Sequence, residues 1–191
     1  MVGDLKKDII FEIYKDTRAV FRINDIALLL NSADDYLLSQ KLNYYVKKGK
    51  LLNLRRGIYA KDGYKPEELA CLLYTPTYIS LAYVLQRNAV IFQYDSAITN
   101  VSYLSREVKI DNQRIEYRQI KDEILLNTAG IIYQNNINIA TLERAFLDSL
   151  YLGGSLYFDN LKPLNIDKIN ELLPIYNSNV LNKKIKKIIE I

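Results

Sequence analysis

The hydrophobic period of the chain changes at Gly49, and this change limits what the first third can fold into. Before Gly49, apolar residues recur every three or four positions, the spacing of amphipathic helices, in segments near Leu5–Tyr14, Ile26–Leu30 and Ser32–Lys48. After Gly49, the runs LLNL and GIYA have strand character and are separated by Arg55-Arg56-Gly57. A brief β-prone stretch, RAVFRI, separates the first two helices. Three helices with a tight polar turn between the second and third, followed by a β-hairpin, predict a winged helix-turn-helix over residues 1–65.

Residues 66–191 are predicted to form a second domain of mixed α/β type, so the fold class of the whole chain is α+β. The alternating β-branched pattern between Val90 and Ile139 predicts several strands, with a hairpin between Val108 and Ile120. Helical spacing predicts helices that begin at Pro66, cover Ser80–Asn88 and the segment ATLERAFLDSLYL, and recur near Asp167–Leu173 and Asn179–Ile189.

The chain has no histidine and only one cysteine, Cys71, which excludes zinc sites of the usual Cys/His kind and histidine-based catalysis. The acidic residues are scattered, and no glycine-rich phosphate loop occurs. The segment IEYRQIK places Glu116, Arg118 and Lys121 on one predicted strand, a weak nuclease-like pattern that alternating charge on an exposed strand explains equally well. We therefore predict no enzymatic activity, no catalytic residue, no metal site and no cofactor.

No apolar stretch precedes the first charged helix, and no run approaches the roughly 18 apolar residues of a membrane span. A single cysteine suits a reducing compartment. These features predict a cytoplasmic protein without a membrane partner.

Positive charge is concentrated in the first 65 residues, which hold 13 basic and 8 acidic residues within a chain of formal net charge +4. From Lys41 to Lys65 there are eight basic residues and one acid, Asp62. Such a distribution predicts contact with a polyanion, and we expect these cations to share one rigid surface. The lysines of the tail, between 183 and 187, are either a second phosphate contact or basic residues that favour a helix C-terminus, the interpretation that we prefer.

The third predicted helix presents a polar strip opposite its apolar side. Amide groups on this strip can pair with adenine edges, and its terminal lysine suits a phosphate. The two arginines between the hairpin strands would contact phosphates or the adjacent minor groove. These considerations select eight candidate DNA-binding residues: Tyr36, Gln40, Asn43, Tyr44, Lys47, Lys48, Arg55 and Arg56. The alternative is that the fold docks a protein and that these polar and basic residues are only solvated.

Several segments, in the same order, resemble AbiEi-family antitoxins of bacterial abortive-infection toxin–antitoxin operons. They are LNYYVKKGKLLNLRRGIYA, PTYISLAYVLQRNAVI, IEYRQI and IATLERAFLDSLYL, the last with Arg144 where the family usually has lysine. The resemblance spans roughly residues 5–155. It implies DNA contact at Lys47, Lys48, Arg55 and Arg56, and it carries over no catalytic residue.

The resemblance also implies a function. The N-terminal domain would bind inverted repeats in the double-stranded DNA upstream of its own operon as an autorepressor. The C-terminal domain would counteract a nucleotidyltransferase-type toxin, with or without a stable physical complex. The competing hypothesis is a protein-interaction module that neutralises the toxin by direct docking.

Overall fold

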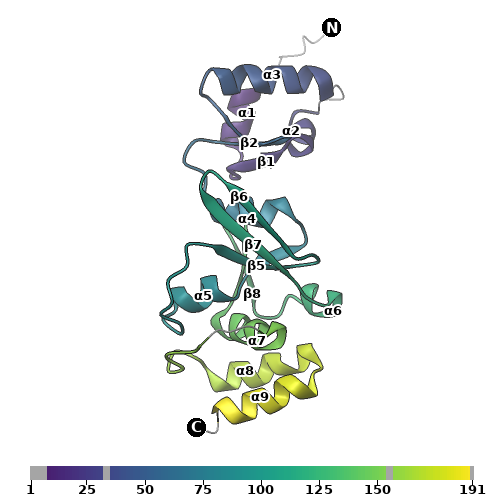
Figure 1. Cartoon of the computed structure of the whole chain (residues 1–191). Coiled ribbons are helices and arrows are strands. Elements are labelled where there is room, and N and C mark those ends of the chain that lie inside the picture. The colour runs from purple at the N-terminus through teal and green to yellow at the C-terminus, as the bar shows by residue number, and fades with distance from the viewer. Residues whose placement is uncertain (1–7, 32–34, 154–156, 190–191) are drawn as a thin grey trace. The chain divides into compact units, whose positions relative to one another are not determined.

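The computed structural model describes residues 8–31, 35–153 and 157–189, and within them helices combine with two β-sheets (Figure 1). The predicted α+β class is confirmed. The chain divides into two compact units, an N-terminal unit of Met1–Leu72 and a C-terminal unit of Leu73–Ile191. The sequence placed the boundary after Lys65. Helix α4 (Pro66–Leu73) follows that point and, except for Leu73, belongs to the N-terminal unit.

The N-terminal unit alternates helices with the strands of a small antiparallel sheet whose strand order is β1-β3-β2. Its elements before α4 are α1 (Ile9–Lys15), β1 (Val20–Arg22), α2 (Ile23–Leu30), α3 (Asp35–Lys47), β2 (Leu52–Arg55) and β3 (Ile58–Ala60).

The core of this unit forms where the three helices meet the sheet. Ile13 of α1, Phe21 of β1, Ile26 of α2 and Leu42 of α3 are completely buried in one cluster. Leu38 lies in the same cluster, and Tyr45 and Val46 of α3 pack against it. The apolar side that helical phase assigns to α3 is therefore the side that packs on α1 and α2.

Acidic side chains set the starts of the first two helices. Helix α1 begins at Ile9, where the Asp8 carboxylate accepts the Ile10 N–H at 3.0 Å. Helix α2 begins at Ile23, before the position that Asn24 as a predicted N-cap would give, because the Asp25 carboxylate accepts the Arg22 N–H at 2.8 Å. The predicted start of the first helix at Leu5 and the predicted cap at Ser32 lie outside the described residues.

A buried carboxylate attaches α4 to the first strand. Glu68 Oε1 accepts the N–H groups of Ala19 at 2.7 Å and of Val20 at 3.1 Å, and Glu68 is 6% exposed. Ala19 precedes the edge strand β1, and Val20 is the first residue of that strand. Without the Glu68 carboxylate, these two N–H groups would lose their acceptor. Glu68 therefore holds α4 within the N-terminal unit.

Replacing this carboxylate tests the attachment. In Glu68→Ala, the amides of Ala19 and Val20 lose their acceptor, and we expect them to exchange with solvent about tenfold faster or more. In Glu68→Gln, the amide oxygen can still accept, so the acceleration should be much smaller. Amide hydrogen exchange of the full chain measures both, and equal rates in Glu68→Ala and wild type would contradict the role given to Glu68.

The C-terminal unit is built on a six-stranded sheet of order β6-β7-β5-β4-β9-β8. The β4–β9 and β5–β7 pairs are parallel and the other pairs are antiparallel. Helices α5 and α7 pack against each other, and α8 and α9 contact α7 (Figure 1). The elements are β4 (Thr77–Ile79), α5 (Ala82–Arg87), β5 (Ile98–Ser102), β6 (Arg106–Ile110), β7 (Gln113–Gln119), α6 (Asp122–Leu125), β8 (Ile131–Gln134), β9 (Ile137–Ala140), α7 (Leu142–Leu152), α8 (Ile166–Leu172), the 3₁₀ helix η1 (Leu173–Tyr176) and α9 (Asn179–Ile189).

The sequence patterns predict most of these elements but miss β4, where they indicate a turn. All three residues of β4 are buried. A strand buried on both faces has no alternation of apolar and polar residues, and one this short cannot be recognised by length either.

A charged cluster lies inside the C-terminal unit, where the side chains of Arg144 and Asp148 on α7 are both completely buried. Arg144 Nε lies 3.4 Å from Asp148 Oδ1, and the Arg144 guanidinium also donates to the carbonyl oxygens of Ile124 at 2.7 Å and Ala129 at 2.9 Å. The pair thus connects α7 to α6 and to the loop after α6.

Three hydroxyl groups complete the cluster by donating to the Asp148 carboxylate. Ser80 Oγ and the Tyr176 hydroxyl each lie 2.7 Å from it, and the Tyr78 hydroxyl lies 3.2 Å from it. Burial and the adjacent Asp148 charge raise the pKa of both tyrosines, so their hydroxyls remain protonated donors. The carboxylate therefore joins the β4 region to α7 and η1.

This cluster predicts a difference between single and double variants. Arg144→Met leaves a buried carboxylate without its countercharge, which should destabilise the C-terminal unit by about 3–5 kcal/mol. Adding Asp148→Asn removes that charge but keeps an oxygen acceptor for the three hydroxyls, so the double variant should regain part of the loss. Native-state hydrogen exchange of α7 amides measures the free energies. A double variant no more stable than Arg144→Met would contradict this account.

Candidate nucleic-acid interface

The outward side of α3 carries the polar strip predicted from helical phase. Gln40, Asn43 and Lys47 are exposed, and the side chains of Tyr36 and Tyr44 are 72% and 56% exposed. All five lie away from the buried residues Leu38 and Leu42. The strip is therefore available to an external partner along the length of the helix.

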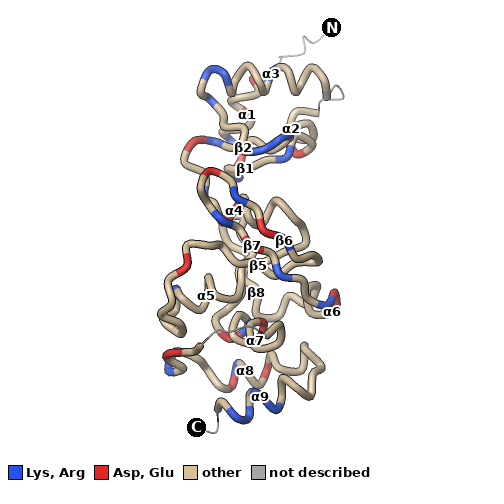
Figure 2. The backbone as a smooth tube through the Cα atoms, in the orientation of Figure 1, with Lys and Arg blue, Asp and Glu red and all other residues tan. Residues whose placement is uncertain are grey.

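The carboxyl end of α3 forms the first of two cationic groups, which we call the helix-end group: Lys47, Lys48 and Lys50. Gly49 has φ +67°, a conformation that glycine adopts readily, and it lets the chain turn directly into β2. The Gly49 and Lys50 N–H groups each donate at 2.9 Å to α3 carbonyls. Figure 2 shows basic residues at this end of α3.

The second cationic group, which we call the hairpin-turn group, consists of Arg55, the last residue of β2, and Arg56 in the turn before β3. Gly57, with φ +76°, completes the turn, and its carbonyl oxygen accepts the Ile23 N–H at 2.9 Å. This bond attaches the turn to the start of α2. At the other end of the hairpin, the Tyr14 hydroxyl donates to the Lys50 carbonyl oxygen at 3.0 Å. The hairpin is thus held to the helices at both ends.

The eight predicted residues do not form one compact cluster. The helix-end group precedes β2 and the hairpin-turn group begins at the last residue of β2, so the two are separated by the length of that strand, roughly 10 Å. The structure therefore presents the α3 strip together with two distinct cationic groups of the same rigid unit.

The cations of both groups are exposed, and none of them forms a salt bridge with a carboxylate in the described part of the chain. Lys48 Nζ lies 5.7 Å from the centre of the Tyr44 ring, a contact that leaves its charge unneutralised. A protein surface that gathers like charges without acids carries a positive potential suited to an anionic partner.

Lys61 is an exception to the expected shared surface. Its ammonium donates to the Asp16 carbonyl oxygen at 2.6 Å and lies 5.7 Å from the ring centres of Tyr14 and Phe21. Burial lowers the pKa of Lys61. Lys61 therefore belongs to the internal packing of the N-terminal unit and not to the candidate interface.

Glu116, the acid of the nuclease-like segment, lies with two other acids around an arginine. Arg114 on β7 lies 2.5 Å from Asp95, forms an ion pair with Glu116 and lies 3.9 Å from Glu107. The Arg114 guanidinium holds the pKa of Asp95 below its ordinary value. The acidic residues are scattered along the sequence, but these three lie around one side chain. That side chain is Arg114, a cation of the protein itself. Among the described residues, no group of three or more histidine, cysteine or acidic side chains could hold a metal ion.

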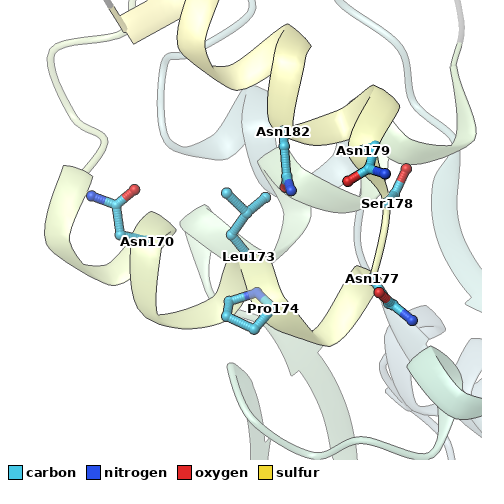
Figure 3. Close-up of a pocket in the computed structure, with 7 residues that line it drawn as sticks. All are labelled: Asn170, Leu173, Pro174, Asn177, Ser178, Asn179 and Asn182. Carbon is cyan, nitrogen blue, oxygen red and sulfur yellow. The ribbon is translucent and has the colours of Figure 1, made fainter.

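A shallow pocket of about 330 Å³ in the C-terminal unit is lined by amide groups (Figure 3). Asn170 comes from α8, and Asn177, Asn179 and Asn182 surround the start of α9 together with Ser178. Every residue that lines the pocket is uncharged, so the pocket offers no acid, base or cation for catalysis.

The buried Arg144–Asp148 cluster was missed by reasoning from the sequence, which treated Arg144 only as a replacement for lysine. A signal was present: arginine and aspartate stand four positions apart within the apolar run ERAFLDSLYL. That spacing places both on one side of a helix, and apolar neighbours indicate that this side is buried.

Comparison of the chain with protein-family models and with curated proteins found no match. None of the described helices combines the length and apolar character needed to cross a bilayer.

Proposed function

We propose that the chain is a DNA-binding transcriptional autorepressor and antitoxin of a bacterial toxin–antitoxin operon, with no catalytic activity of its own. The observation that carries the DNA-binding part is the exposed polar strip of α3, flanked by two cationic groups that no described carboxylate neutralises.

The order of elements supports a winged helix-turn-helix. Helices α2 and α3 follow one another, and the hairpin of β2 and β3 joins β1 in a sheet of order β1-β3-β2. In this proposal α3 is the recognition helix, which lies in the major groove with its polar strip toward the bases. The hairpin is the wing, and Arg55 and Arg56 contact phosphates or the adjacent minor groove.

Attachment of the hairpin at both ends also supports this function. Because Ile23 bonds to Gly57 and Tyr14 bonds to Lys50, little ordering of the wing is needed when DNA binds. The exposed cations can then release counterions from the duplex without first breaking internal ion pairs.

The antitoxin part rests on the resemblance to AbiEi-family antitoxins and involves the C-terminal unit. The cognate toxin is proposed to be of nucleotidyltransferase type, the operator an inverted repeat and the location cytoplasmic. If the protein instead neutralises its toxin by direct docking, toxin will co-purify with the full chain and Arg55→Ala/Arg56→Ala will leave protection intact.

Removing the hairpin-turn group should flatten the salt dependence of DNA binding. In Arg55→Ala/Arg56→Ala, we expect weaker binding to all duplexes and a decrease of about 1 in the slope of log K against log salt for each phosphate that the variant no longer neutralises. Fluorescence anisotropy of a labelled duplex at several salt concentrations measures the slope. Lys162→Ala/Lys168→Ala removes two exposed lysines of the C-terminal unit as the matched control. An unchanged slope in the arginine variant would refute the wing assignment.

Shortening the amide side chains of α3 should reduce discrimination rather than general affinity. For Gln40→Ala or Asn43→Ala, removal of a bidentate hydrogen bond to a base should narrow the difference between operator and random DNA by about 1–3 kcal/mol. Competition binding against both duplexes measures this difference, with Gln134→Ala as an exposed amide control on β8. Equal weakening on operator and random DNA would show that these amides contact only the backbone.

A further inference from the structure

The chemistry of the α3 strip indicates which bases the proposed repressor reads, an inference that rests on the proposed DNA-binding function. Recognition helices contact base edges mainly through their amino-terminal part. In α3 (Asp35–Lys47) the first half presents Tyr36 and Gln40 on the exposed side, and Asn43 follows there one turn after Gln40. These three side chains offer an aromatic ring and two amides.

The amides and the rings favour adenine and thymine. Glutamine and asparagine pair bidentately with adenine N6 and N7, and apolar groups contact the thymine methyl. The Tyr44 ring supplies a second apolar surface near the strip, and it is held in place by an edge-on contact with Tyr45 at a centroid distance of 5.4 Å. The strip therefore matches both members of an A·T pair.

The usual means of reading guanine is missing from α3. Guanine is most often read by a bidentate arginine, or by lysine, and no arginine occurs between Asp35 and Lys47. Lys47 is the last residue of the helix, next to the turn into β2, where a phosphate contact is the natural role. Lys41 follows Gln40 directly and so lies about 100° around the helix from it, at the Tyr44 side of the strip and not between the two amides.

The arginines of this surface lie instead on the hairpin turn. Arg55 and Arg56 are both exposed there and form no salt bridge with a described carboxylate. Narrow minor grooves of A-tracts carry an enhanced negative potential that attracts inserted arginines. A wing of this composition favours A·T pairs in the flanking minor groove.

We infer that the duplex bound by this protein is A·T-rich both under the α3 strip and in the minor groove that faces the hairpin turn. The α3 strip reads adenine N7 and the thymine methyl, and the hairpin-turn group reads the shape of the groove.

Selection of bound duplexes from a random library by the full-length protein is the first test. We expect the bound pool to be enriched in A·T pairs at two adjacent positions, one for α3 and one for the hairpin turn. A pool with unchanged or G·C-rich composition would overturn the inference while leaving DNA binding intact. Failure to bind any duplex would overturn the proposed function and the inference together.

Base analogues in the selected duplex then separate the contacts. Replacing the adenines under α3 by 7-deazaadenine removes N7 and should weaken binding by about tenfold, and replacing thymine by uracil removes the methyl and should weaken it several-fold. The first effect should vanish in Gln40→Ala/Asn43→Ala and the second in Tyr36→Ala. Effects that persist in these variants would overturn the assignment to the α3 strip.

Inosine tests the hairpin-turn group. An inosine·cytosine pair keeps the minor-groove pattern of A·T, since it lacks the 2-amino group of guanine. In the flanking site we expect inosine·cytosine to bind like A·T and guanine·cytosine to bind more weakly. The difference should disappear in Arg55→Ala/Arg56→Ala. Equal binding of all three flanks by the wild type would refute minor-groove reading.

Discussion

Burial of one side of α3 is the constraint on which the candidate interface depends. Leu38 and Leu42 enter the core that Phe21 and Ile26 also form, and this fixes the rotation of the helix about its axis. With that rotation set, Gln40 and Asn43 must face outward. The polar strip is therefore a consequence of core packing, and its geometry is as rigid as the core itself.

The lysines at the end of α3 and the arginines of the hairpin turn form no salt bridge with a described carboxylate, while several acids of the N-terminal unit accept hydrogen bonds elsewhere. Each of four acidic side chains stabilises local structure by accepting hydrogen bonds from backbone amides or from Arg18: Asp8, Asp16, Asp25 and Glu68. These four acids thus serve helix starts, a strand edge and Arg18. The lysines at the end of α3 and the arginines of the hairpin turn are exposed, and they produce a positive potential suited to an anionic partner.

The C-terminal unit uses charge in the opposite way. The side chains of Arg144 and Asp148 are completely buried. They form hydrogen bonds with segments that are distant in the sequence. Through these hydrogen bonds the pair connects α6, η1 and the β4 region to α7. On the surface of the same unit, Arg114 gathers three acids that would otherwise repel one another.

The sequence alone determined the features that depend on neighbours a few positions apart: the phase of α3, the turn at Gly49, the hairpin before Ala60 and the exclusion of histidine chemistry. Periodicity and turn residues are local signals, so they can be recognised without knowledge of the fold. Tertiary structure decided which charges are free. Lys61 and Lys48 look alike in sequence, yet one packs on Phe21 and the other remains exposed. Tertiary structure also decided that Glu68 of α4 binds the amides of Ala19 and Val20 and that Arg144 lies beside Tyr176. A partner dozens of residues away leaves no periodic trace in the chain.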